Sequence, residues 1–162
     1  MKKATLFTAL LFLSCYARAQ WSMDPAVNTP VCTAAEKQID PRMMEDGTGG
    51  AYIVWKDYRN GASNPDIIVQ RLNAKGIPQW TLNGIAVCSD PADQSTPALV
   101  SDMRGGAIIA WSDWRSGVER DLYAQRIDSN GMVQWTVNGA NISNLSNREH
   151  SEKLASDGKG GV

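Results

Sequence analysis

Two pairs of charged residues with the same spacing are the first candidates for chemistry in this sequence. Asp57 and Arg59 recur as Asp113 and Arg115, each pair two residues apart and directly after an apolar run. An arginine at such a position could bind a carboxylate or a sugar, because the guanidinium group holds acidic oxygens in a fixed fork. The same geometry also suits an internal brace between the arginine and its own aspartate. Recurrence favours the brace, because a catalytic residue is needed once and a structural residue in every repeat.

Aromatic residues beside these pairs are the second set of candidates. Tyr58 and Trp114 lie between the aspartate and the arginine of each pair, where an exposed ring on a loop could contact a ligand. With Arg59 and Arg115 they form a possible ligand-binding rim. The other recurring aromatic residues could stack on sugars, but we expect them to fill the core. The residues expected to be structural in every repeat are Trp55, Asp57, Trp80, Trp111, Asp113 and Trp135.

Other catalytic and metal-binding patterns are missing from the sequence. His150 is the only histidine, so neither a Ser-His-Asp triad nor a histidine-rich metal site can be assembled. The segment Asp128-Ser129-Asn130-Gly131 has too few carboxylates at alternate positions for a calcium loop, and an Asx turn explains it. We therefore expect no catalytic residue, no metal site and no cofactor in this chain.

The first residues have the pattern of an export signal. Two lysines precede an apolar run from Ala4 to Leu13, and Ala17-Arg18-Ala19 follows. This pattern predicts a secretory signal peptide over residues 1–19, cleaved after Ala19. The apolar run is about half the ~20 residues needed to span a bilayer, so we expect no transmembrane segment after cleavage. An alternative is a lipoprotein signal with Cys15 as the lipidated residue. Both alternatives predict a secreted or cell-surface protein.

Charge and cysteine content limit the partners. The formal net charge of the chain is -1 at pH 7, so we expect no nucleic acid partner. Cys32 and Cys88 remain after cleavage and occupy equivalent repeat positions, in a compartment that permits disulfides. They could pair only if their Cα atoms lie within about 7 Å. We favour two small buried apolar residues instead, and pairing stays open.

A tandem repeat of about 56 residues positions all of these candidates. The segment Asp46–Arg59 recurs as Asp102–Arg115, and the match continues from 66–72 to 121–127. Periodic self-similarity of this length is typical of solenoids and propellers. The expected divisions are a signal peptide over 1–19, a partial first repeat over 20–45, full repeats over 46–101 and 102–156, and the start of another repeat over 157–162.

Each repeat has the pattern of an antiparallel β-sheet. The run Ala107–Trp111 is apolar throughout and bounded by Gly-Gly and a polar cluster, which suits a strand buried on both faces. Its counterpart is Ala51–Trp55, and residues 121–127 alternate as the next strand. We also expect a strand over Pro97–Ser101 and one over Met132–Trp135. Glycine-rich turns separate these segments, and none has sustained helical spacing.

Stacking of these units is required, because a lone small sheet leaves one apolar face bare. Radial stacking would give a β-propeller of about 4–8 four-stranded blades, and linear stacking would give a β-solenoid. We favour an all-β incomplete propeller, an open arc of low stability. We also expect the sequence to be a fragment, followed in the full protein by further repeats of the same chain.

Several motifs recur around the central apolar strand. They are Gly105-Gly106, Trp111-Ser112-Asp113, Arg115, the strand 121–126 and the hairpin from Asp128 to Trp135. A unit with these motifs resembles the sialidase-like, Asp-box class of β-propellers. The box is degenerate, because Trp135 lies four residues after Gly131 instead of three and Asn73 replaces Asp128 in the first copy. The repeat is also similar to those of large secreted bacterial proteins that end in a C-terminal sorting signal.

These resemblances imply a secreted or cell-surface scaffold or binding module, non-catalytic, whose ligand is a polysaccharide or a protein. The alternative is a glycoside-hydrolase, sialidase-like enzyme whose catalytic blades are missing from this chain. Sialidase chemistry in that family uses an arginine cluster with a Tyr, a Glu and an Asp. The Arg-Ile-Pro segment typical of the family is absent, since Arg42 follows Pro41 in the wrong order. We therefore favour binding over catalysis.

Overall fold

All regular structure in the described part of the chain is β-strand. The computed structural model describes residues 24, 26, 28–143 and 153–162, so the predicted signal peptide, Cys15 and His150 lie outside the described residues. The strands are β1 (Gln38–Glu45), β2 (Ala51–Asp57), β3 (Asp66–Leu72), β4 (Ile85–Cys88), β5 (Gln94–Ser101), β6 (Ala107–Asp113), β7 (Asp121–Ile127) and β8 (Ala140–Ser143). The prediction of an all-β fold is confirmed. The described residues contain no helix that could cross a membrane.

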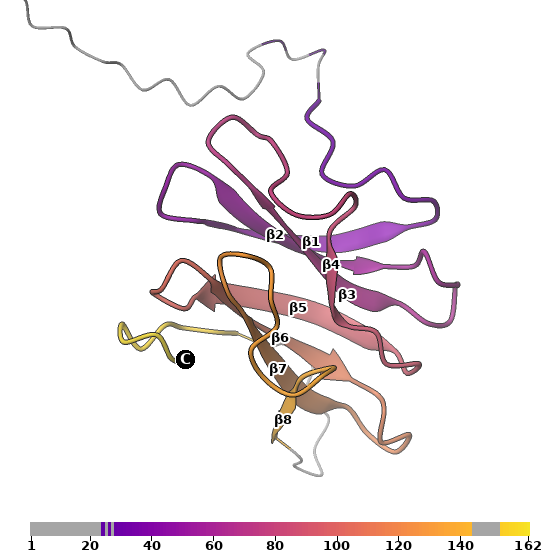
Figure 1. Ribbon diagram of the computed structural model, residues 1–162. Helices are drawn as coiled ribbons and strands as arrows, with labels where there is room; N and C mark the ends of the chain where they lie inside the picture. The colour runs from indigo at the N-terminus through magenta and orange to yellow at the C-terminus, as the bar shows by residue number, and fades with distance from the viewer. Residues whose placement is uncertain (1–23, 25, 27, 144–152) are drawn as a thin grey trace, which may run out of the picture.

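The strands form two antiparallel sheets of four strands each (Figure 1). Sheet 1 has the order β1-β2-β3-β4 and sheet 2 the order β5-β6-β7-β8, so each is a simple meander. Each sheet begins with the strand that the sequence divisions place at the end of the preceding unit. A periodic sequence has no intrinsic starting point, and hydrogen bonding sets where each sheet begins.

The two sheets stack face to face, as consecutive units of an incomplete propeller do. β5 lies across β1, β2 and β3 of sheet 1, and Figure 1 shows sheet 1 above sheet 2. Burial of each large apolar side chain between them contributes about 1.5–3 kcal/mol. The shared core consists of Tyr52, Val54, Ile67, Val69, Val87 and Cys88 from sheet 1 and Ala107, Ile109, Trp111 and Ile127 from sheet 2.

A bulge interrupts the first strand of each sheet at the same place. The register shifts between Ile39 and Arg42 in β1 and between Ser95 and Ala98 in β5. Each bulge contains a proline, which has no N–H group to donate to the ladder. The residue before each proline has a positive φ, 52° and 50° respectively. The extra residue bends both first strands in the same way.

The strand predicted over Met132–Trp135 is wrong, because a glutamine side chain ends the pairing there. Only Val133 forms an isolated bridge to the preceding strand. After Val133, the buried Gln125 side-chain amide binds the backbone where a neighbouring strand would otherwise pair. Its Nε2 donates to the Thr136 carbonyl at 2.8 Å, and its Oε1 accepts the Trp135 N–H at 2.9 Å. The chain turns away, and the fourth strand forms only at β8. Gln70 does the same in sheet 1.

Candidate functional site

A buried carboxylate organises the end of the central strand of sheet 2. β6 ends at Asp113, whose side chain is fully buried. It accepts hydrogen bonds from Trp111 Nε1 at 2.9 Å and from three Arg115 donors, the backbone N–H at 2.9 Å, Nε at 2.9 Å and Nη2 at 2.6 Å. The Arg115 guanidinium also lies 3.7 Å from the centroid of the Tyr123 ring. The ion pair of Asp113 with Arg115, and its counterpart Asp57 with Arg59, are called the charged forks below. The fork of sheet 2 is thus held by residues at the end of β6.

Sheet 1 repeats this arrangement. Asp57 accepts hydrogen bonds from Trp55 Nε1 at 2.7 Å and from Arg59, through its backbone N–H at 2.9 Å, Nε at 2.8 Å and Nη2 at 2.6 Å. Burial by itself would raise the pKa of Asp57, but the hydrogen bonds from Arg59 and Trp55 outweigh it and lower the pKa. The carboxylate therefore stays ionised against its arginine.

The Nη2 group of each arginine also binds the loop before the fourth strand. Arg59 Nη2 donates to the Asn83 carbonyl at 2.8 Å, and Arg115 Nη2 donates to the Asn138 carbonyl at 2.9 Å. The arginine side chains are only 24% and 20% exposed, respectively. Most of each arginine side chain is thus packed against the protein, and only a minor part faces the predicted rim.

The cysteines are free thiols that contact these arginines. Cys32 Sγ lies 3.5 Å from Arg59 Nη2, and Cys88 Sγ lies 3.4 Å from Arg115 Nη2. Cys88 belongs to β4 of sheet 1, whereas Arg115 follows β6 of sheet 2, so this contact joins the two sheets. Burial raises the pKa of the Cys88 thiol to about 12, which keeps it protonated.

Two aromatic rings remain at the surface beside the charged forks. The Tyr58 N–H donates to the Lys37 carbonyl at 2.9 Å, and the Trp114 N–H donates to the Asp93 carbonyl at 3.0 Å, so both backbones are fixed in the same way. Trp114 is 40% exposed, and Tyr58 is half-buried. A hollow of about 270 Å³ adjoins Tyr58 and is lined by Glu36, Lys37, Ile39, Tyr58 and Ala62.

A charged bridge joins the two rings, and sequence reasoning missed it. The Asp93 carboxylate forms ion pairs with Lys56 Nζ at 2.8 Å and with Arg120 Nη2 at 2.6 Å. Lys56 lies 5.4 Å from the centroid of the Tyr58 ring, and Arg120 lies 5.7 Å from that of Trp114. Burial opposes ionisation of Asp93, but its two cationic partners outweigh burial and lower its pKa. The bridge carries no repeat signal, because the counterpart of Asp93 is a lysine.

The other recurring tryptophans lie in two environments. Trp55 and Trp111 are buried. Trp80 of sheet 1 reaches sheet 2, where its Nε1 donates to the Ser129 carbonyl at 3.4 Å. Its counterpart Trp135 is 39% exposed. The two positions are equivalent in sequence, but among the described residues a following sheet covers only the first.

An aspartate at the start of β3 has an unusual environment. Asp66 is buried and lies opposite Asp57, and its Oδ2 accepts Asn60 Nδ2 at 2.5 Å. Its other oxygen has no hydrogen-bond partner among the described residues, and burial raises its pKa. No group of three or more His, Cys, Asp or Glu side chains within the described residues could hold a metal ion.

The turn at Asp128 is an Asx turn. Asp128 Oδ1 accepts the N–H groups of Asn130 at 2.9 Å and Met132 at 3.0 Å. The aspartates that start the turns between the first two strands do the same, and Asp46 accepts Thr48 and Gly50 N–H, both at 2.8 Å. Local backbone donors thus satisfy these oxygens.

Comparison of the chain with protein-family models, with curated proteins and with solved structures gave no match.

Proposed function

We propose that this protein is an exported, non-catalytic scaffold and binding module built from propeller-like repeats. The observation that carries the proposal is how the recurring charged groups are used. In both sheets the aspartate at the strand end accepts hydrogen bonds from the arginine two residues later and from the tryptophan two residues earlier, at nearly identical distances. Groups held in this way brace the fold in every repeat, whereas a catalytic residue has to be free to contact substrate.

The rings between the paired residues are the proposed binding elements, and the proposed ligand is a polysaccharide. Tyr58 and Trp114 stand at the same end of neighbouring sheets, and packed sheets lie about 10 Å apart. An extended polymer of repeating units would therefore meet one ring in each sheet. Aromatic faces provide contact area for sugar rings at small entropic cost, since only two torsions are fixed. Lys56, Asp93 and Arg120 supply polar groups between the rings.

The resemblance to sialidase-like propellers and the predicted export belong to the same proposal. Two consecutive antiparallel meanders that cover each other are the expected units of a propeller. The lysines, apolar run and Ala-Arg-Ala site at the start of the chain support export. A cell-surface location would bring the rim into contact with extracellular polysaccharides.

A glycan array probed with the chain from residue 20 onward tests the binding proposal. We expect retention on a subset of polysaccharides, and we expect Trp114→Ala to lower the affinity by about tenfold or more, equivalent to about 1.4 kcal/mol. Trp135→Ala is the matched control, because Trp135 is 39% exposed against 40% for Trp114 and lies near the other end of sheet 2. Equal loss in both variants, or no binding to any glycan, would contradict the proposed rim.

A fluorogenic sialoside assay on the same protein tests the non-catalytic part. We expect no turnover above a buffer control. Turnover above that control would overturn the non-catalytic part of the proposal.

A further inference from the structure

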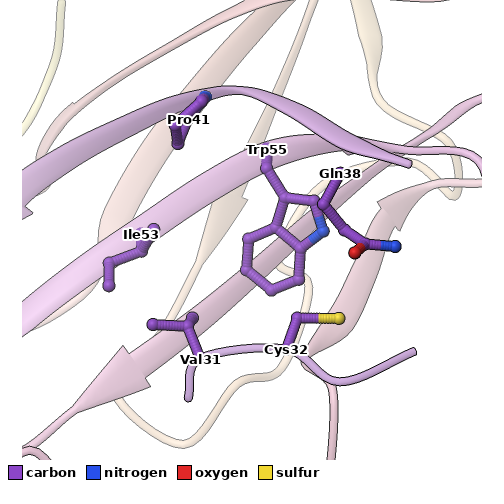
Figure 2. A pocket seen from close by; sticks show the side chains of 6 residues that line it. All are labelled: Val31, Cys32, Gln38, Pro41, Ile53 and Trp55. Atoms are coloured by element: carbon purple, nitrogen blue, oxygen red, sulfur yellow. The ribbon is translucent and has the colours of Figure 1, made fainter. Parts of the chain in front are cut away.

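Two hollows of sheet 1 differ in what happens to the corresponding residues one repeat later. The first has a volume of about 240 Å³, and Figure 2 shows Val31 and Cys32 opposite Trp55 and Ile53 in it. Its lining residues are Val31, Cys32, Gln38, Pro41, Ile53 and Trp55, and their counterparts Val87, Cys88, Gln94, Pro97, Ile109 and Trp111 are all buried. The first hollow therefore has the residues of a contact between sheets, and we assign no ligand to it.

The second hollow is the one of about 270 Å³ beside Tyr58, and its counterparts stay at the surface. The lining residues Glu36, Lys37, Ile39, Tyr58 and Ala62 correspond to Ala92, Asp93, Ser95, Trp114 and Val118. None of these five counterparts is buried, although sheet 1 packs on sheet 2, and Trp114 and Val118 are 40% and 81% exposed. The position is thus open to solvent even in a sheet whose neighbour is present, so an absent neighbour does not explain the hollow.

An arginine side chain occupies the corresponding place in sheet 2. Arg120 Cζ lies 5.7 Å from the centroid of the Trp114 ring, and its Nη1 and Nη2 donate to Ser95 Oγ and Asp93 Oδ2, both at 2.6 Å. The counterparts of these three partners all line the hollow of sheet 1, and they are Tyr58, Ile39 and Lys37. The counterpart of Arg120 itself is Pro65, a buried ring without a donor. Sheet 1 therefore keeps open a place that sheet 2 fills with its own side chain.

The lining of the open hollow combines apolar surface with one donor and one acceptor. The Tyr58 ring and the exposed Ile39 side chain offer apolar surface to the face of a sugar ring. The Glu36 carboxylate can only accept hydrogen bonds, and the Lys37 ammonium can only donate them. Neither of these two side chains has a hydrogen-bond or ion-pair partner among the described residues. Neighbouring hydroxyl groups of a sugar can satisfy both, because a hydroxyl group donates and accepts.

Charge and volume narrow the ligand group further. Glu36 and Lys37 are adjacent and of opposite sign, so together they add no net charge that would select an ion. The third charged group near the ring, Lys56, is already paired with Asp93, and its side chain is only 9% exposed. The volume of about 270 Å³ lies just below the range of about 300–1,000 Å³ that is typical of whole small-molecule sites. The hollow therefore suits one uncharged ring of a longer chain.

We propose that the hollow beside Tyr58 is the subsite that selects the sugar, and that it binds one neutral pyranose unit of the polysaccharide. Glu36 accepts a hydrogen bond from one hydroxyl group of that unit, and Lys37 donates one to another. Trp114 contacts a further unit of the same polymer and adds affinity without selecting the sugar, because Arg120 already fills the place beside its ring. This assignment rests on the proposed polysaccharide binding and adds the class of sugar and the residues that recognise it.

Titration calorimetry of the chain from residue 20 onward tests the subsite with soluble neutral glucan, mannan and galactan and with the acidic polymers alginate and polygalacturonate. We expect a neutral polymer to bind, with affinity changed less than about twofold between about 50 and 500 mM salt. Ala62→Phe fills the hollow and is expected to weaken binding at least about tenfold, as are Glu36→Ala and Lys37→Ala, which remove hydrogen bonds from charged groups. The matched control Val118→Phe places the same ring at the counterpart position and is expected to change affinity less than about twofold.

The outcomes separate this subsite from the proposed function itself. Ala62 and Val118 are both exposed, so both variants are expected to keep the fold, which far-ultraviolet circular dichroism checks. Binding that Trp114→Ala weakens and Ala62→Phe leaves unchanged would overturn the subsite and leave the polysaccharide-binding rim in place. So would equal losses in Ala62→Phe and Val118→Phe, or binding to the acidic polymers alone that salt abolishes. A chain that binds none of the polymers would overturn the subsite together with the proposed function.

Discussion

Removal of the Arg115 side chain separates a brace from a ligand-binding group. The guanidinium group forms a two-point fork on the buried Asp113 carboxylate, binds the Asn138 carbonyl and covers the Tyr123 ring. Arg115→Ala leaves the Asp113 carboxylate buried, with the Trp111 indole N–H, one backbone N–H and the Cys88 thiol as its remaining donors. If Arg115 is a brace, the loss appears in stability.

The expected loss follows from the burial of the pair. Removal of one partner of a buried ion pair costs about 3–5 kcal/mol, because an uncompensated charge stays in the interior. The Asp113 side chain is 0% exposed and that of Arg115 is 20% exposed. Three of the five donors to the carboxylate remain, so we expect the low end of this range, about 3 kcal/mol.

Urea unfolding followed by tryptophan fluorescence measures this loss, because Trp111 lies in the cluster. The control is Arg104→Ala, which removes an exposed arginine of the same sheet and is expected to change stability by no more than about 0.5 kcal/mol. The double variant Asp113→Ala/Arg115→Ala is expected to lose less than the sum of the two single variants, because the two groups interact directly.

A loss below about 1 kcal/mol for Arg115→Ala would refute this reasoning, because it would place the pair among exposed ion pairs. Unchanged stability together with lost glycan binding would identify Arg115 as part of the ligand site. The ion pair with Asp113 would then be the arrangement of the ligand-free protein only.

Three further predictions follow from the same contacts. The pKa of Asp46 lies at about 2, below its ordinary 3.8, because hydrogen bonds from its turn and an arginine outweigh burial. The ionised Asp46 carboxylate therefore stabilises the fold above pH 3.8, and this stabilisation is lost as the pH falls toward 2. Asp46→Asn is expected to make the urea unfolding midpoint less dependent on pH between about pH 5 and 2. Cys88 is expected to resist iodoacetamide at pH 8 until the protein unfolds, and rapid native labelling, read by mass spectrometry, would contradict its burial. Gly139→Ala is expected to lower the thermal midpoint more than Gly117→Ala. Both have positive φ, but only at Gly139 would the new Cβ meet a ring, that of Trp111, and equal shifts would contradict this packing.

The repeat made the fold class predictable, because recurring residues define the same local structure twice. The runs at Ala51–Trp55 and Ala107–Trp111 lie within β2 and β6, and the strand expected at Pro97–Ser101 lies within β5. The prediction of a strand over Met132–Trp135 was wrong, because the periodicity of the sequence does not reveal a side chain that ends the backbone pairing between strands. The recurrence of Gln70 and Gln125 was the available signal, since a buried amide at the same place in two repeats requires partners.

The contacts between sheets were less predictable than those within a sheet. The sequence predicts that neighbouring units cover each other, but not which side chains meet. Tyr52 donates its hydroxyl to the Gly105 carbonyl across the interface, although its counterpart Ile108 has no hydroxyl. The bridge through Asp93 also occurs once in the described residues. Pairings that do not recur depend on the placement of one sheet on the other, which local propensity does not encode.

The distinction between recurring and unique contacts also bears on function. Recurring groups such as Asp57 and Asp113 have the same partners in each sheet, so their conservation within the chain is explained by folding. Residues that differ between repeats at the same surface position are free to set ligand preference. Tyr58 and Trp114 hold the same backbone position with different rings, and Lys37 occupies the position that Asp93 takes in the next unit. Specificity of the proposed rim would therefore depend on these varied positions, while the invariant forks beneath them keep the rings in place.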